Sequence, residues 1–135
     1  MADLTISANA ITLVSGPSEY RVLAENAGAG VPVYVTGSTG TVGVADSNVD
    51  GKQTVRGITV GAGSMGDTVQ VALPGAVLNL GATLGVGTLY SLSTNAGKIQ
   101  PVADLTTGET VSLLGAGQTA ALFLLNIWNT GIVHA

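Results

Sequence analysis

"VPVYVTGSTGTVGVAD" (residues 31–46) and "TLYSLSTNAGKIQPVAD" (residues 88–104) are the two stretches that decide the fold. Each contains a run rich in β-branched, aliphatic and aromatic residues, a polar turn with glycine, a second such run, and then Ala-Asp. Glycine supplies the positive φ angle that a tight hairpin turn requires. Both stretches therefore predict a β-hairpin.

The two hairpins also predict an internal duplication. When Gly30 is aligned with Gly87, Gly40 falls on Gly97. After each hairpin, a polar stretch leads into a strand that ends in Val-Gly-Ala-Gly or Leu-Gly-Ala-Gly. Two copies are too few for a solenoid, so the pattern indicates one domain with a pseudo-twofold β core.

The rest of the chain continues this pattern. Its 20 glycines are scattered among short runs of Thr, Val and Ile, and a glycine costs about 1 kcal/mol in a helix interior. The predicted fold is all-β, a small single-domain β-barrel or β-sandwich, with residues 1–14 as an N-terminal arm and first strand and residues 15–135 as the β domain. Strands are predicted over residues 11–14, 20–24, 33–36, 41–44, 54–60, 68–73, 76–80, 88–93, 99–102, 110–114 and 121–128.

The run "AALFLLNIW" (120–128) is apolar on both faces of a strand. Such a strand is expected at the centre of a sheet or under a neighbouring subunit. The N-terminal segment 2–14 is a second candidate contact, because an edge strand or arm can add to a neighbour's sheet. The residues predicted to form an interface are Leu4, Ile6, Ile11, Leu13, Phe123, Leu125 and Trp128.

Charged residues make up only 9% of the chain, against roughly 25% in ordinary soluble proteins. A surface with so little charge favours association, so we expect a permanent partner. Four basic residues against eight acidic ones form no basic stripe, and we therefore expect no nucleic-acid partner. The longest strongly apolar run, residues 120–125, is too short to span a bilayer, which predicts no membrane association.

Gly61-Ala62-Gly63-Ser64-Met65-Gly66 matches the G-x-G-x-x-G spacing of a dinucleotide-binding loop. That site requires a helix after the glycines, whose N-terminus binds the pyrophosphate. Residues 67–74 instead alternate with period two and end in proline. The sequence therefore predicts a turn followed by a strand, and no cofactor.

Ser64, Asp104 and His134 occur in the chain order of an α/β-hydrolase triad. The predicted strands do not provide the strand-to-helix turn on which that serine lies. His134 is the only histidine and the penultimate residue, where chains are usually loosely held. We expect no catalytic residues and no enzymatic activity.

Residues Asp46 to Gly51, "DSNVDG", imitate the start of a calcium-binding loop. The twelfth position of such a loop is a bidentate glutamate, but here it is Gly57. The favoured interpretation is an Asx-rich connection that satisfies its own backbone groups. No metal site is assigned, and weak cation binding at this turn stays open.

The stretch "NLGATLGVGTLYSLSTNAGKIQPVADLTTGETVSLLGAG" (79–117) resembles the capsid decoration, or cement, proteins of tailed bacteriophages. The resemblance covers most of the chain, and three positions or stretches depart from the family pattern: residues 31–33, Lys98, and the ending "NIWNTGIVHA". The segments that carry the resemblance are Asp3 to Ile6, Gly30 to Tyr34, Gly57 to Thr59, Gly81 to Tyr90 and Asn95 to Leu105.

The resemblance implies a homotrimer on the outer capsid surface of the virion, which bridges subunits of the major capsid protein. A second hypothesis is a tail or fibre module that binds a host glycan. Aromatic residues make up only 4% of the chain, which gives little material for stacking against sugars.

Overall fold

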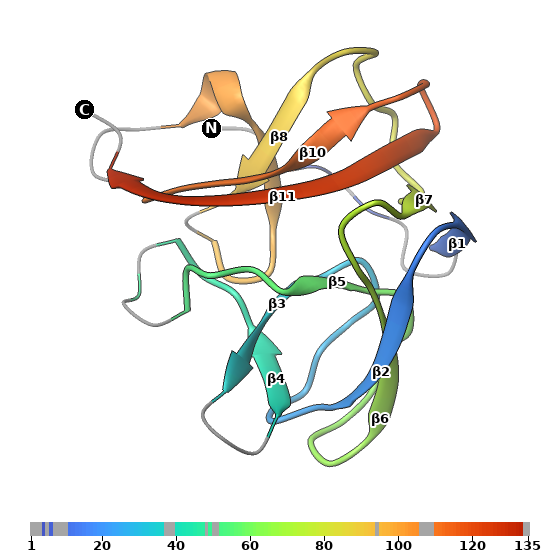
Figure 1. Cartoon of the computed structure of the whole chain (residues 1–135), viewed down its shortest axis with the longest axis vertical. Helices are drawn as coiled ribbons and strands as arrows, with labels where there is room; N and C mark the ends of the chain where they lie inside the picture. The colour runs from blue at the N-terminus through green and yellow to red at the C-terminus, as the bar shows by residue number, and fades with distance from the viewer. Residues whose placement is uncertain are drawn as a thin grey trace.

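The computed structural model describes residues 4, 6, 11–36, 40–47, 49, 52–93, 95–105 and 110–133. They form two antiparallel sheets, one of six strands and one of five, that pack against each other in a sandwich-like arrangement (Figure 1). Neither sheet closes into a barrel. Within these residues the strands are β1 (Thr12–Ser15), β2 (Ser18–Val22), β3 (Pro32–Thr36), β4 (Thr41–Val44), β5 (Gly57–Thr59), β6 (Thr68–Ala72), β7 (Val77–Asn79), β8 (Leu89–Leu92), β9 (Ile99–Pro101), β10 (Thr110–Gly117) and β11 (Leu122–Val133), with one short 3₁₀ turn, η3 (Val102–Asp104).

The prediction of an all-β fold is confirmed, and a strand occurs in each of the eleven predicted ranges. The main difference lies in β10 and β11, which extend to Gly117 and Val133 because they pair with each other along one long hairpin. The range 54–60 contains a strand only at β5. Its residue Val55 bonds through its backbone to the side chain of Asn129.

The duplication predicted from the hairpins extends to the whole topology. One sheet has the order β2-β6-β5-β3-β4, and the other has the order β7-β11-β10-β8-β9 with β1 added outside β7. Five consecutive strands thus repeat the same arrangement. The aligned glycines agree in conformation, with φ angles of 75° at Gly30 and 76° at Gly87, and of 76° at Gly40 and 72° at Gly97.

The edge strands of the two sheets find their backbone partners in different ways. The five-stranded sheet curls until its edge strands β2 and β4 approach, and the segment after β2 forms a parallel bridge between Leu23 and Val42. The six-stranded sheet stays open. Its edges are occupied by the N-terminal segment, since β1 pairs with β7 and the Leu4 N–H donates to the Ile99 carbonyl of β9 over 2.7 Å.

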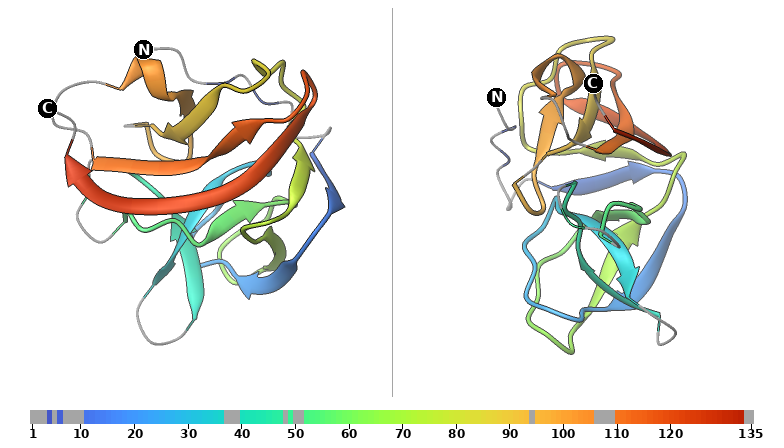
Figure 2. Two further views of the ribbon diagram at one scale, coloured as in Figure 1. Left: turned by 45° about the horizontal axis from the view of Figure 1, so that its top comes forward. Right: turned by 90° about the vertical axis from the view of Figure 1, so that its left-hand side faces the viewer.

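The larger hydrophobic core lies on the inner face of the six-stranded sheet and at its junction with the five-stranded sheet (Figure 2). Phe123 and Tyr90 meet there edge to face, with ring centroids 6.0 Å apart, a favourable aromatic geometry. A smaller core, inside the curled five-stranded sheet, contains Leu23, Val33, Val42, Val69 and Val71. Along β6, Val69 and Val71 are buried as the period-two pattern predicts, and Leu73, beyond the strand end, is half-buried.

Polar contacts join the two halves at the far end of the β10–β11 hairpin. The Asn129 side chain on β11 accepts from the Val55 N–H at 2.8 Å and donates to the Val55 carbonyl at 3.1 Å. The Ser112 hydroxyl on β10 donates to the Gln53 carbonyl at 2.7 Å. No helix among the described residues is long and apolar enough to cross a membrane.

Candidate interaction surface

The glycine loop at residues 61–66 is a turn between β5 and β6, as predicted. Gly66 has a φ of 93°, and the Asp67 carboxylate accepts from the Ser64 N–H at 2.8 Å. Strand β6 follows directly, so Gly66 leads into no helix N-terminus that would bind a pyrophosphate.

The residues in hydrolase order are not brought together. Ser64 lies in the β5–β6 loop of the five-stranded sheet, and Asp104 lies in η3, next to the six-stranded sheet. These two segments lie at opposite ends of the molecule (Figure 1). His134 lies outside the described residues.

The calcium-like turn is described only at Asp46, Ser47 and Val49. The Asp46 N–H donates to the Lys52 carbonyl at 2.9 Å, and the Lys52 N–H donates to the Val49 carbonyl at 3.0 Å. The backbone therefore closes a local turn. Within the described part of the chain, no group of three or more His, Cys, Asp or Glu side chains is placed to hold a metal ion.

Most of the predicted interface residues pack into the chain's own core. Phe123 and Leu125 are fully buried on the inner face of β11. The N-terminal members of the set, Leu4, Ile6, Ile11 and Leu13, contact the same core. Trp128 differs from all of these, because 67% of its surface is exposed.

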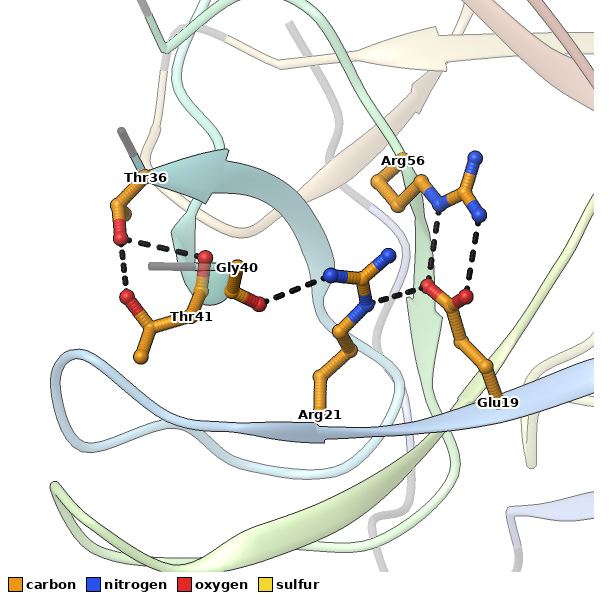
Figure 3. Close-up of polar contacts among 6 residues, drawn as sticks. All are labelled: Glu19, Arg21, Thr36, Gly40, Thr41 and Arg56. Carbon is orange, nitrogen blue, oxygen red and sulfur yellow. Dashed lines mark hydrogen bonds and ion pairs between the residues drawn. The ribbon is translucent and has the colours of Figure 1, made fainter. Parts of the chain in front are cut away.

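A charged cluster closes the curled edge of the five-stranded sheet (Figure 3). The carboxylate of Glu19 on β2 accepts a hydrogen bond from Arg21 Nε at 2.7 Å. It accepts two more from Nε and Nη2 of Arg56, each at 3.0 Å. Arg21 Nη1 also donates to the Gly40 carbonyl, at the start of β4, over 3.0 Å. Arg21 therefore spans the gap between β2 and β4, while Glu19 holds both guanidinium groups.

This arrangement changes the acidity of Glu19. Hydrogen bonds from Arg56 and then from Arg21 stabilise the carboxylate and lower the pKa of Glu19 to about 2. The same carboxylate raises the pKa of Arg56. Two of the four basic residues of the chain are thus used in a contact that holds an edge, which is a structural role.

The outer face of the six-stranded sheet is apolar over its central strands. The register places Leu113 of β10 opposite Trp128 of β11, and Ala116 opposite both Leu124 of β11 and Leu89 of β8. Residues directly opposite in a sheet project to the same face. Leu114, Phe123 and Leu125 are buried in the core on the inner face. Because Leu113, Leu124 and Trp128 lie on the opposite face, both faces of these strands carry large apolar side chains. We call the group Leu89, Leu113, Ala116, Leu124 and Trp128 the outer apolar face.

A groove of about 460 Å³ runs through the outer apolar face. Leu89 and Trp128, 51% and 67% exposed, stand at its sides. Asn126 is the one polar side chain that lines it, and no lining residue is charged. A sheet whose second face meets water normally alternates apolar and polar residues, and a contiguous apolar patch marks an interaction site.

The sequence predicted part of the outer apolar face. The apolar character of residues 120–128 on both faces predicted a central strand or one covered by a neighbouring subunit, and Trp128 was among the predicted contacts. Leu89 and Leu113 were missed, because only the pairing of β8 and β11 with β10 brings them beside Trp128. The alternation in "TLYSL" (88–92) was the available signal for Leu89.

Comparisons with protein-family models, with curated proteins and with solved structures found no match.

Proposed function

We propose that this protein is a capsid decoration protein of a tailed bacteriophage. It binds the outer surface of the capsid as a homotrimer and bridges neighbouring major capsid subunits. The observation that carries the proposal is the outer apolar face: an uncharged, grooved sheet surface on a chain with very few charges. Such a surface acts by burial against other subunits.

Two further features support the proposal. The segments that resemble decoration proteins include the repeated hairpins, whose aligned glycines adopt matching conformations. The chemistry-bearing motifs of the sequence are either separated in space, as are Ser64 and Asp104, or built into structural contacts, as are Glu19, Arg21 and Arg56. The proposal therefore assigns no catalytic residue and no cofactor.

The test is binding to empty capsid shells. Purified protein is mixed with expanded and with unexpanded shells made from the major capsid protein of the same phage, and the shells are sedimented. We expect co-sedimentation with expanded shells at a fixed ratio to the capsid protein, and a higher melting temperature of the decorated shell. Absence of binding to either kind of shell would contradict the proposal.

A second candidate function, a glycan-binding tail or fibre module, is favoured by one observation. Trp128 is exposed and lies beside Asn126 in the groove, and an aromatic face next to a polar group is a common way to bind a sugar. A glycan array distinguishes the two functions. Binding of a defined glycan that is lost in Trp128→Ser would favour this alternative.

A further inference from the structure

The outer apolar face offers both a projecting side chain and a recess. Trp128 projects from β11 with 67% of its surface exposed, and the groove lies directly beside it between Leu89 and Leu113. A surface that carries a knob and a hole side by side is complementary to a copy of itself. In a ring such as a trimer, each copy can give Trp128 to one neighbour and its groove to the other.

The charge of the surface favours the same occupant. The chain has a formal net charge of −4, so two copies repel each other weakly over most approaches. The groove contains no charged side chain, and contact there places no like charges together. A strongly charged partner finds nothing on this face to pair with.

The size of the face is adequate for such a contact. Strands lie about 5 Å apart and rise about 3.3 Å per residue, so the paired strands β10 and β11 present roughly 260 Å² over the length of β10. A standard interface buries roughly 800 Å² on each partner, with an apolar centre and a polar rim. The outer apolar face is large enough to be that centre, and the surrounding strand ends would supply the rim.

We propose that a second copy of this chain covers the outer apolar face, with Trp128 of one copy seated in the groove between Leu89 and Leu113 of the next. This inference rests on the proposed function, since it names the surface through which the copies of the trimer associate. It assigns Trp128 as the central contact of the association. Buried tryptophans at the centre of an interface are typical sites of high binding energy.

The chain offers a matched control for Trp128. Tyr20 on β2 is an aromatic residue of similar exposure, 71%, but it lies in the five-stranded sheet, outside the outer apolar face. The variants Trp128→Ser and Tyr20→Ser therefore remove equally exposed aromatic side chains from two different surfaces. A third variant, Leu113→Ser, tests the wall of the groove without touching the indole.

The experiment measures molar mass in solution by light scattering for the wild type and the three variants, with circular dichroism to verify folding. We expect an oligomer for the wild type and for Tyr20→Ser, and association weakened about 100-fold or more in Trp128→Ser. Leu113→Ser is expected to weaken association by a smaller factor. If Trp128→Ser loses its fold, the result for Leu113→Ser decides.

Two outcomes would overturn the inference. In one, the wild type has the mass of a single chain at every concentration. In the other, folded Trp128→Ser and Leu113→Ser associate as tightly as the wild type. If the wild type is a single chain that binds expanded shells, and Trp128→Ser abolishes that binding, the groove receives the capsid protein. The inference and the homotrimer then fail, while the proposed binding to the capsid stands.

Discussion

The two halves of the molecule share one strand order but differ in how they complete their surfaces. In the five-stranded half, β2 curls toward β4, and the pair is joined by Arg21 and Glu19. In the six-stranded half, the N-terminal segment bonds to both edges, through β1 at β7 and Leu4 at β9, and Leu89 and Trp128 on the outer face are exposed. The comparison shows how one topology yields a curled half and an open half. We expect only the open half to serve for assembly.

The core provides the test with the largest expected effect. Phe123 and Val69 are the second residues of the equivalent strands β11 and β6, and both are buried. Because Phe123 lies in the larger core, Phe123→Ala is expected to lower the free energy of unfolding by about 3–5 kcal/mol, and Val69→Ala by about 2 kcal/mol. Chemical denaturation of both variants measures the difference. A larger loss of stability for Val69→Ala would show that the main core lies in the five-stranded half, and would contradict this account.

A pair of equivalent glycines gives the next largest difference. Gly115 has a φ of 152°, and a Cβ there would collide with the Leu124 carbonyl oxygen. Gly61 occupies the matching place in the other half, where nothing lies within 4 Å. We expect Gly115→Ala to lower the free energy of unfolding by about 3 kcal/mol and Gly61→Ala to lower it by less than about 0.5 kcal/mol. Chemical denaturation of the two variants measures these changes. Equal effects at the two glycines would contradict the bulged geometry of β10.

The charged cluster of the five-stranded half provides the smallest effect, and it depends on pH. Glu19→Gln keeps the shape of the side chain but leaves Arg21 and Arg56 without their carboxylate. Because solvent reaches this cluster, we expect a cost of about 1 kcal/mol at pH 7. The matched control is Glu25→Gln, since the Glu25 carboxylate accepts the Val44 N–H and belongs to neither ion pair of this cluster.

The pH dependence follows from the lowered pKa of Glu19. Its ionised form is favoured in the folded state, so its contribution to stability is complete above the unfolded pKa, near 4.5, and is lost as the pH falls toward about 2. The difference in stability between the wild type and Glu19→Gln is therefore expected to shrink over this interval. A difference that stays constant from pH 7 to pH 2 would show that the ion pairs contribute nothing.

The sequence predicted the strands well because hairpins are local. The turns at Gly40 and Gly97 depend on a few neighbouring residues, and their alignment already indicated the duplication. The edges could not be predicted in this way. Arg56 lies 37 residues from Glu19, and only the order of the strands in the sheet brings the two together.

The candidate surface was predicted in part for the same reason. A strand that is apolar on both faces indicates a central strand or one covered by a neighbouring subunit, but it does not say which side chains face the chain's own core. Phe123 and Leu125 were expected at an interface and lie on the inner face, whereas Trp128 lies on the outer one. Period-two alternation along β11 already places Trp128 on the face opposite Phe123 and Leu125. The irregular register between Leu113 and Gly115 brings Leu113 to the same face as Ala116, and no periodic pattern in the sequence reveals it.

Trp128 is the only tryptophan in the chain, so its fluorescence reports directly on the outer apolar face. The most direct measurement follows its emission wavelength and its quenching by acrylamide as protein concentration rises. If copies cover this face, emission shifts to shorter wavelength and quenching falls as the oligomer forms, while Tyr20→Ser behaves in the same way. Emission from a water-exposed indole in a sample that is fully oligomeric would show that the copies associate elsewhere and would contradict the account.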